Sequence, residues 1–289
     1  MCKLKPILLG LSLAVAGSSL AVAQEPASAP KILQITREFI KPYKNGMAHD
    51  KTESAFTAAM TKAKFPAYYL GLDSMSGKER ALFFTWYTSF EEWEADNKII
   101  AKNSTLAGEL EHASVADGDL LDSVDQGVFR FNPDMSYKPR LDVSFARYVE
   151  VTEFHVKAGH GRDWEKIVKM VKDAHDKAGT SAHWGMYEIA YGAEDGTYLV
   201  LSGHKSMSEI DTGFGENKKF ADAIGQDGMK KLDELFGNTV DYSRSELFSV
   251  NPKQSYVSED WIKSDPAFWK PKAAASAAKA AATAKKTTP

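Results

Sequence analysis

The sequence contains almost no cysteine. Its 289 residues include a single one, Cys2, close to the N-terminus. A disulfide needs two cysteines and a thiolate zinc site needs at least two, so the sequence excludes both. The free energy of folding must therefore come from a packed apolar core, and a chain of this length can build one.

The sequence also has no large excess of charge of either sign. It contains 36 Lys and Arg against 39 Asp and Glu, for a net charge of −3. Because nucleic-acid-binding chains usually carry a strong basic field, we expect no nucleic-acid partner. Four catalytic motifs are missing as well: G-x-G-x-x-G, G-x-x-x-x-G-K-[ST], H-E-x-x-H and G-x-S-x-G. Their absence argues against nucleotide enzymes, zincin-type proteases and ordinary serine hydrolases.

The one long apolar run lies at the N-terminus and is typical of an export signal. Lys3 and Lys5 precede an apolar stretch that ends in the small residues Ala21-Val22-Ala23. This pattern predicts a signal peptide over residues 1–23, cleaved near Ala23 and followed by a linker over residues 24–30. We therefore expect a bacterial periplasmic or secreted protein, with no integral membrane segment after cleavage.

The C-terminal end has a different composition. Residues 271–289 consist mainly of alanine and lysine, which cannot bury an apolar face, so we predict a disordered tail. Two roles are open for this tail: it is solvated without a specific function, or it binds an anionic polymer of the cell envelope electrostatically. Residues 257–270 form a C-terminal extension, which Trp261 and Trp269 are expected to fasten to the rest of the protein.

Self-similar segments divide the middle of the chain into two parts. The hexamer over residues 132–137, NPDMSY, matches the hexamer over residues 251–256, NPKQSY. Weaker matches occur upstream in the same order, with a spacing that stays between 115 and 119 residues. We infer two repeats, over residues 31–137 and 146–256.

Each repeat has the pattern β-α-β-β-α-β. In the first repeat we expect strands over residues 32–40, 67–72, 80–87 and 126–131, and helices over 47–64 and from 89 to about 115. In the second we expect strands over 148–156, 182–190, 197–204 and 242–250, and helices over 162–178 and within 206–236. Ser89 and Glu92 form a capping box at one helix start.

This order is that of the ferredoxin-like split βαβ fold. We therefore predict an α+β protein with two tandem ferredoxin-like βαββαβ repeats, packed sheet on sheet as an intrachain pseudo-dimeric α/β barrel. Since one chain supplies both halves, we expect a monomer. The side chains expected to fill the space between the sheets are Phe83, Phe84, Trp86, Leu199 and Leu201.

The start of the second repeat resembles a known group of proteins. The segment over residues 151–164, VTEFHVKAGHGRDW, resembles the opening of dimeric α/β-barrel proteins, and more narrowly of NIPSNAP-like and antibiotic-biosynthesis-monooxygenase-like (ABM-like) proteins. In such families two subunits usually make the barrel. The resemblance implies a fold that serves cofactor-free monooxygenases, haem-degrading enzymes, isomerases, peroxidase-like enzymes and proteins without known activity, so it selects no reaction.

Histidines on the strands of the second repeat are the candidates for a catalytic site. His183 opens one strand of a hairpin and His204 ends the other, so the two should be neighbours, whereas His155 lies on the preceding strand. A neutral imidazole there could act as a general base or bind haem iron. These residues could equally be ordinary half-buried or surface histidines. No third ligand accompanies them, so no metal site is predicted.

Aromatic residues could line a pocket for a flat organic ligand, or could simply be part of the core. The candidates are Tyr68, Tyr69, Trp184 and Tyr187.

Two groups of carboxylates also stand out. An acidic cluster, with calcium binding as the alternative, is interpreted as helix capping and a solvated loop: Asp117, Asp119, Asp122 and Asp125. Glu38 and Glu153 each precede a phenylalanine in matching segments of the two repeats, which predicts a shared structural task such as a charge pair.

Two hypotheses of function remain. The first is an exported small-molecule-binding or non-catalytic barrel protein of the cell envelope, without a cofactor, whose ligand would be small and apolar or aromatic. The alternative is a cofactor-free monooxygenase-like or haem-binding enzyme that uses a pocket in the second repeat. Whether the chain is an enzyme stays open.

Overall fold

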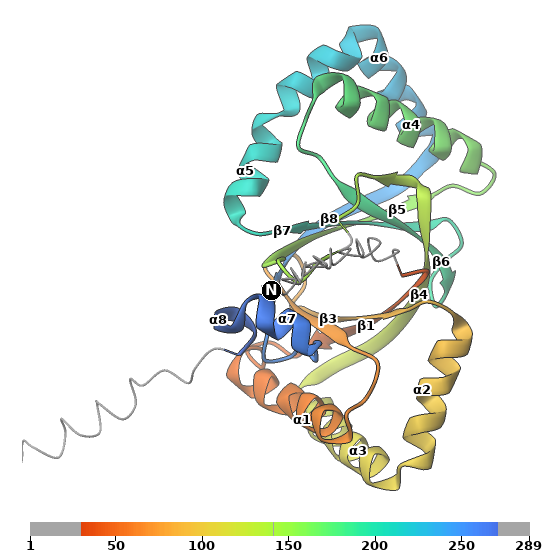
Figure 1. Ribbon diagram of the computed structural model, residues 1–289. Helices are drawn as coiled ribbons and strands as arrows, with labels where there is room; N and C mark the ends of the chain where they lie inside the picture. The colour runs from red at the N-terminus through yellow and green to blue at the C-terminus, as the bar shows by residue number, and fades with distance from the viewer. Residues whose placement is uncertain (1–29, 141, 271–289) are drawn as a thin grey trace, which may run out of the picture.

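The computed structural model describes residues 30–140 and 142–270 (Figure 1). Within them, eight strands form one closed antiparallel barrel in the order β1-β3-β2-β8-β5-β7-β6-β4. The strands are β1 (Ile32–Ile40), β2 (Tyr69–Ser74), β3 (Arg80–Tyr87), β4 (Leu121–Tyr137), β5 (Tyr148–Val156), β6 (Trp184–Tyr191), β7 (Thr197–His204) and β8 (Val240–Val250). The helices are α1 (Met47–Ala63), α2 (Phe90–Lys102), α3 (Ser104–Gly118), α4 (Gly161–Ala178), α5 (Met207–Gly215), α6 (Asn217–Thr239), α7 (Glu259–Ser264) and α8 (Pro266–Trp269). The predicted signal peptide, most of the linker and the C-terminal tail lie outside the described residues.

The barrel consists of two halves with the same order of elements. The first half contains β1–β4 with α1–α3, and the second contains β5–β8 with α4–α6. The two four-stranded sheets face each other and also join at both edges, where β2 pairs with β8 and β4 pairs with β6. The helices of each half cover the outer face of its own sheet, so they lie on opposite sides of the barrel (Figure 1).

Alternate residues of the strands point into the barrel and fill it. Phe84 and Leu199 are buried in this interior cluster, and Trp86 and Leu201 pack against it, as predicted. Phe83 does not face the interior; it packs with Ile40 and Ala81 on the outer side. The reason is the two-residue period of a strand, which sends neighbouring side chains to opposite faces.

Helices α7 and α8 pack at one mouth of the barrel. Trp261 lies against Trp86, with ring centroids 6.5 Å apart, and against Trp269 at 5.5 Å. Arg147 at the start of the second half forms an ion pair with Asp265. The C-terminal extension is thus tied to the interior cluster by aromatic packing.

The two matched hexamers make equivalent contacts, each with a strand of the other half. The Oγ atom of Ser136 accepts a hydrogen bond from the backbone N–H of Met186 at 2.9 Å, and that of Ser255 accepts one from Gly71 at 2.9 Å. Each hexamer therefore crosses from its own half and packs on the other. At Gly71 a Cβ would lie only 2.7 Å from the carbonyl oxygen of Gln254, so this close approach requires glycine.

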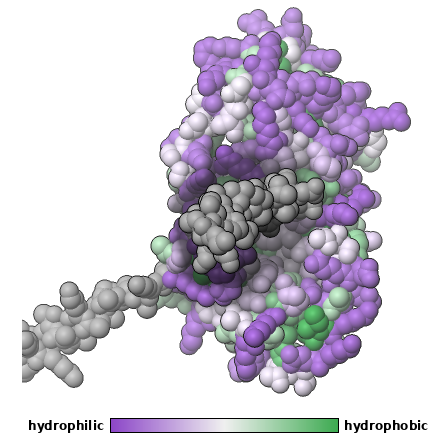
Figure 2. Space-filling view, in the orientation of Figure 1, coloured by the Kyte–Doolittle hydropathy of each residue, from purple (hydrophilic) through white to green (hydrophobic). Residues whose placement is uncertain are grey.

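The surface seen in Figure 2 is mostly hydrophilic, with apolar residues in small groups. In the described part of the chain, no helix combines the length and the apolarity needed to cross a bilayer.

Candidate functional site

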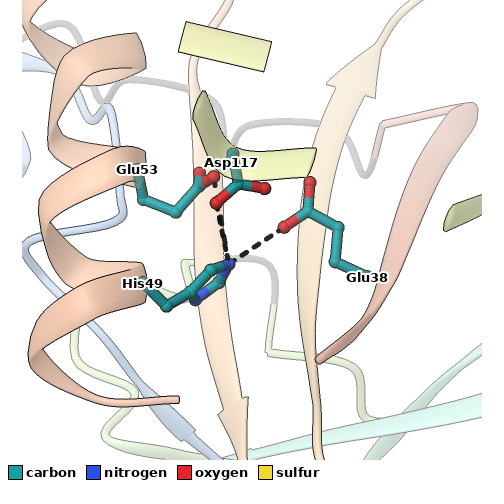
Figure 3. Close-up of side chains that lie close together, drawn as sticks. All are labelled: Glu38, His49, Glu53 and Asp117. Atoms are coloured by element: carbon teal, nitrogen blue, oxygen red, sulfur yellow. Dashed lines mark hydrogen bonds and ion pairs between the residues drawn. The ribbon is translucent and has the colours of Figure 1, made fainter. Parts of the chain in front are cut away.

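A cluster of ionisable side chains lies between sheet and helices in the first half (Figure 3). Its members, Glu38, His49, Glu53 and Asp117, each offer one atom within 4.8 Å of the others. The Nε2 atom of His49 lies 3.1 Å from Glu38, 3.6 Å from Asp117 and 4.0 Å from Glu53. We call these four residues the first-half cluster.

Three elements bring the first-half cluster together. Glu38 lies on the outer face of β1, and Asp117 lies in the last turn of α3. His49 and Glu53 are four residues apart on α1, so they share one face of the helix, which points to the sheet. All except Glu38 are almost completely buried: the exposed fraction is 0% for His49, 3% for Glu53 and 2% for Asp117.

The electrostatics of the first-half cluster are unfavourable for bare carboxylates. Burial raises the pKa of Glu53 well above its usual range, and the charges of Glu38, Asp117 and Asp73 raise it further. Burial lowers the pKa of His49, but the hydrogen bond to Glu38 and the nearby carboxylates outweigh it and raise the pKa. The cluster therefore attracts protons or cations.

Further polar groups surround the first-half cluster. Thr52 donates a hydrogen bond to Asp117 at 2.5 Å, and the Nε2 atom of Gln254 lies 3.3 Å from Nδ1 of His49. Two buried oxygens close by, Oε1 of Gln254 and the phenol oxygen of Tyr69, have no hydrogen-bond partner within the described residues, and neither has Oε1 of Glu53.

Sequence reasoning missed the first-half cluster. The sequence predicts helix capping and a solvated loop for the acidic cluster, but its member Asp117 is buried in α3 and accepts the hydrogen bond of Thr52. The one usable signal was the i, i+4 spacing of His49 and Glu53 within a predicted helix. Apolar residues at helical spacing in this helix, such as Ala48 and Ala55, predict a buried face that the structure does not show, because both are exposed.

A second candidate site lies in the second half, where the predicted residues His183, Trp184 and His204 meet. They line a cavity of about 390 Å³, within the range of ordinary ligand pockets. Its other lining residues include Arg140, Glu150, His175, Ser202, Glu209 and Phe214. The rings of His183 and His204 are 5.4 Å apart and nearly perpendicular, at 65°.

The two histidines of this cavity differ in what their nitrogens contact. His183 has both nitrogens on carbonyl oxygens, Nδ1 at 3.1 Å from Ser181 and Nε2 at 3.0 Å from Gly203. Because carbonyl oxygens only accept and a neutral imidazole has one N–H, only one of these two contacts can be a hydrogen bond of the neutral ring. His204 has Nε2 on Glu150 at 2.7 Å, and its buried Nδ1 has no hydrogen-bond partner in the part of the chain that the structure describes. Since a carboxylate only accepts, Nε2 carries the proton and Nδ1 of the neutral ring is an acceptor.

His155 lies elsewhere. Tyr148 pairs with His204 at one end of β5 and His155 pairs with Thr197 at the other. Seven residues separate the two ends, which is roughly 23 Å along a strand. There the ring of His155 stacks on Tyr242, with centroids 5.4 Å apart.

The predicted aromatic residues do not join Trp184 around one pocket. Tyr187 is buried inside the barrel, and Tyr69 lies on the outer side near the first-half cluster. Tyr68 is 42% exposed and packs on Tyr256. Of the predicted pocket residues, only Trp184 lines the cavity beside His183 and His204.

The predicted correspondence of Glu38 with Glu153 is wrong by one residue. Glu38 points to the helices, whereas Glu153 points into the barrel, where it accepts a hydrogen bond from Tyr242 and lies near Arg37. The residue that corresponds to Glu38 in the second half is Phe154, because each is the seventh residue of a nine-residue strand.

Comparisons with known proteins bear on the fold. No protein-family model matches the sequence, and no curated protein is similar to it. The structure is similar to that of a candidate monooxygenase from Fusobacterium nucleatum subsp. nucleatum ATCC 25586, with a TM-score of 0.52 and 10% identity over 77% of this chain and 93% of that chain. It is also similar to an anthrone oxidase-like protein, with a TM-score of 0.51 and 12% identity over 78% and 92% of the chains. At such identities the similarity shows the α/β-barrel fold and no activity.

Proposed function

We propose that this chain is an exported α/β-barrel protein, built from two tandem ferredoxin-like repeats, that binds a small aromatic hydroxyl compound in the second-half cavity. The observation that carries the proposal is the buried Nδ1 of His204, which has no hydrogen-bond partner among the described residues while Glu150 holds Nε2. An acceptor nitrogen without a donor is costly in a protein interior, and a ligand hydroxyl would satisfy it.

The surroundings of His204 support this ligand class. Trp184 and Phe214 supply aromatic surface along the cavity wall. Glu209 lies 3.9 Å from Nδ1 of His204 and pairs with Arg140 at 3.3 Å. Both side chains of that ion pair are partly exposed, and such a pair contributes little stability, so it can open to admit a ligand at little cost.

The carboxylate–imidazole pair also supports a second candidate, an enzyme. Glu150 orients the ring of His204, and Nδ1 could take the proton of a substrate hydroxyl as a general base. Two proteins with this fold are described as a candidate monooxygenase and as anthrone oxidase-like, which motivates the test. On this hypothesis, His204→Ala and Glu150→Gln would both abolish turnover.

Haem and the oligomeric state stay predictions. His204 offers one ring nitrogen without a partner, so a Soret band lost in His204→Ala would indicate haem on this residue. The barrel closes within one chain, so closure itself needs no second copy. Light scattering on the purified protein tests the expected monomer.

The ligand proposal is tested with 2-naphthol as the probe, by calorimetry on the purified protein. We expect His204→Ala to weaken binding at least about tenfold, which is 1.4 kcal/mol. His155→Ala is the matched control, since it removes a histidine roughly 23 Å away. Equal binding by both variants would overturn the proposal, and so would the absence of binding together with no ligand mass in the native protein from its own envelope.

A further inference from the structure

We propose that the first-half cluster is a metal site, in which Glu38, His49, Glu53 and Asp117 bind one divalent transition-metal ion. This site lies in the opposite half from the cavity beside His204, so it is independent of the function proposed above.

The geometry of the first-half cluster suits a metal ion. Nitrogen and oxygen ligands lie about 2.0–2.2 Å from zinc, so ligands of a tetrahedral ion are roughly 3.3–3.6 Å apart. The distances from Nε2 of His49 to the three carboxylates, 3.1, 3.6 and 4.0 Å, bracket this range. Small side-chain shifts would therefore complete the coordination shell.

An unsatisfied group points to a missing ligand. Oε1 of Glu53 is buried, aims into the centre of the first-half cluster and has no hydrogen-bond partner in residues 30–140 and 142–270 (Figure 3). Because a buried carboxylate oxygen without a partner is strongly unfavourable, something that the protein itself does not supply is expected to meet it. The phenol oxygen of Tyr69, buried on the same side of the sheet, has no partner either.

The contacts around His49 allow its role as a ligand. A metal-binding histidine usually donates its second ring N–H to an acceptor. Nδ1 of His49 faces the side-chain amide of Gln254, whose own oxygen has no partner. Turning this amide over would place the oxygen on the N–H of Nδ1. It would break the 3.1 Å hydrogen bond from Nε2 of Gln254 to Asp50, which would keep its hydrogen bonds from Asn251 and Lys253.

The second half provides an internal comparison. Helices α1 and α4 both end at a left-handed residue, Lys64 and Gly179, and His49 and Trp164 each lie fifteen residues before it. Strands β4 and β8 begin at matching positions, because Leu121 pairs with Ile40 and Val240 pairs with Val156. The resulting pairs are Glu38 with Phe154, His49 with Trp164, Glu53 with Val168, and Asp117 with Phe236.

All four second-half counterparts are apolar and pack together in one core cluster. The rings of Phe154 and Trp164 are 5.0 Å apart, and those of Phe154 and Phe236 are 6.1 Å apart. The fold is therefore satisfied by apolar residues at these positions. Polar residues at all four matching positions need another reason, which a bound ion supplies.

The donor set selects the class of ion. One imidazole with three carboxylates suits Zn²⁺, Fe²⁺ or Mn²⁺, because an imidazole disfavours Ca²⁺ and Mg²⁺ and the site has no thiolate for softer ions. A divalent ion would offset most of the charge of the three carboxylates. The site is nearly closed, with Glu38 reaching solvent through 12% of its side chain. A closed shell of this kind is typical of structural sites, so the ion would hold α1 and α3 against β1.

The test is metal binding by the chelator-treated full chain. We expect one equivalent of Zn²⁺ by calorimetry, an intense visible spectrum with the probe Co²⁺, and a rise of the Tm with Zn²⁺. In Glu53→Gln, which keeps the side-chain shape, affinity should fall more than about 100-fold and the Tm rise should vanish. Asp117→Asn should behave in the same way.

Glu109→Gln is the matched control, because it removes an α3 carboxylate that pairs with Lys62 on the surface. It should bind Zn²⁺ as the wild type does. Failure of the folded, chelator-treated wild type to bind Zn²⁺, Fe²⁺ or Mn²⁺ would overturn the proposal, and so would unchanged affinity in Glu53→Gln. His204→Ala separates the two proposals, since it should bind Zn²⁺ normally whether or not 2-naphthol binds.

Discussion

The two halves of the barrel place different chemistry at the same point of the fold. Between sheet and helices, the second half packs Phe154, Trp164 and Val168, whereas the first half has Glu38, His49 and Glu53. The strand register and the ends of α1 and α4 are the same around both sets. Either an apolar or a polar set of side chains can therefore occupy this position in the folded barrel. The residue types here can differ between the halves and serve a function.

Energetically, the apolar set contributes to folding and the polar set opposes it. Burying a large apolar side chain stabilises by about 1.5–3 kcal/mol. Burying carboxylates without full pairing destabilises, and apolar replacement of buried charged groups often increases stability. The first half is therefore expected to be the weaker half without its ion and to gain stability on binding it.

The largest expected effect is on the apolar side of the comparison. Trp164→Ala should lower the free energy of unfolding by about 3–5 kcal/mol, because it leaves a cavity in the second-half core. Urea unfolding with and without Zn²⁺ measures it. The Zn²⁺-dependent gain in stability should persist, and its loss would mean that the two cores are not independent.

A variant that gives the first half the apolar residues of the second tests directly whether the polar set is needed for folding. The variant carries the second-half residues at the four matching positions: Glu38→Phe, His49→Trp, Glu53→Val and Asp117→Phe. It also carries Gln254→Met, because Met135 holds the matching position in the other hexamer and packs in the second-half core cluster. Without metal it should be more stable than the wild type by about 1–4 kcal/mol, and it should bind no Zn²⁺. Denaturant unfolding in chelator measures this difference. Lower stability than the metal-free wild type would show that the polar set supports the fold itself.

The halves also differ inside the barrel, where Tyr187 of β6 is at the position that corresponds to Leu72 of β2 in the first half. Burial raises the pKa of Tyr187 to about 12. Below pH 10 the folded and unfolded states are both protonated and stability is complete. Between about pH 10 and 12 only the unfolded chain loses the proton, so stability falls by roughly 2–3 kcal/mol as pH rises.

Tyr187→Phe should remove this part of the alkaline loss. Urea unfolding at pH 9 and pH 11.5 compares the variant with the wild type. Tyr43→Phe, at a residue that is 99% exposed, is the control and should leave the loss as it is. The same alkaline loss in both variants would contradict the assignment to Tyr187.

The smallest change in stability is expected at the start of α5, which has the same hydrogen bond as the start of α2 in the first half. Glu209 accepts a hydrogen bond from the backbone N–H of Lys205, as Glu92 does from Thr88, but Glu209 also pairs with Arg140. Arg140→Ala should change stability by less than about 1 kcal/mol, because the pair is partly exposed. Thermal unfolding checks this, and a larger loss would show that the ion pair holds the cavity wall in place.

Much of the fold could be predicted because its signals are local. The predicted bounds of β3, β5 and β7 agree with the structure, and Ser89 accepts the predicted capping hydrogen bond from Glu92. The bounds of β4 were predicted too short. Its C-terminal hexamer pairs with β6 of the other half, and this contact has no local signal.

The two candidate sites also differ in whether local sequence signals predict them. His183 and His204 could be placed together because a hairpin makes them neighbours. His49 and Asp117 could not, because they lie in separate helices, 68 residues apart in the sequence. Their meeting depends on how α1 and α3 pack on β1.

Periodicity and local turns can be read in the sequence, so they predict the order of elements, the similarity of the two halves and the neighbours within each hairpin. The buried face of each element depends on packing in three dimensions, and so do the joining of the sheets at their edges and the convergence of distant carboxylates on His49. A shift of one residue along a strand reverses the face of every side chain, so Glu38 and Glu153 cannot be distinguished until the register is known.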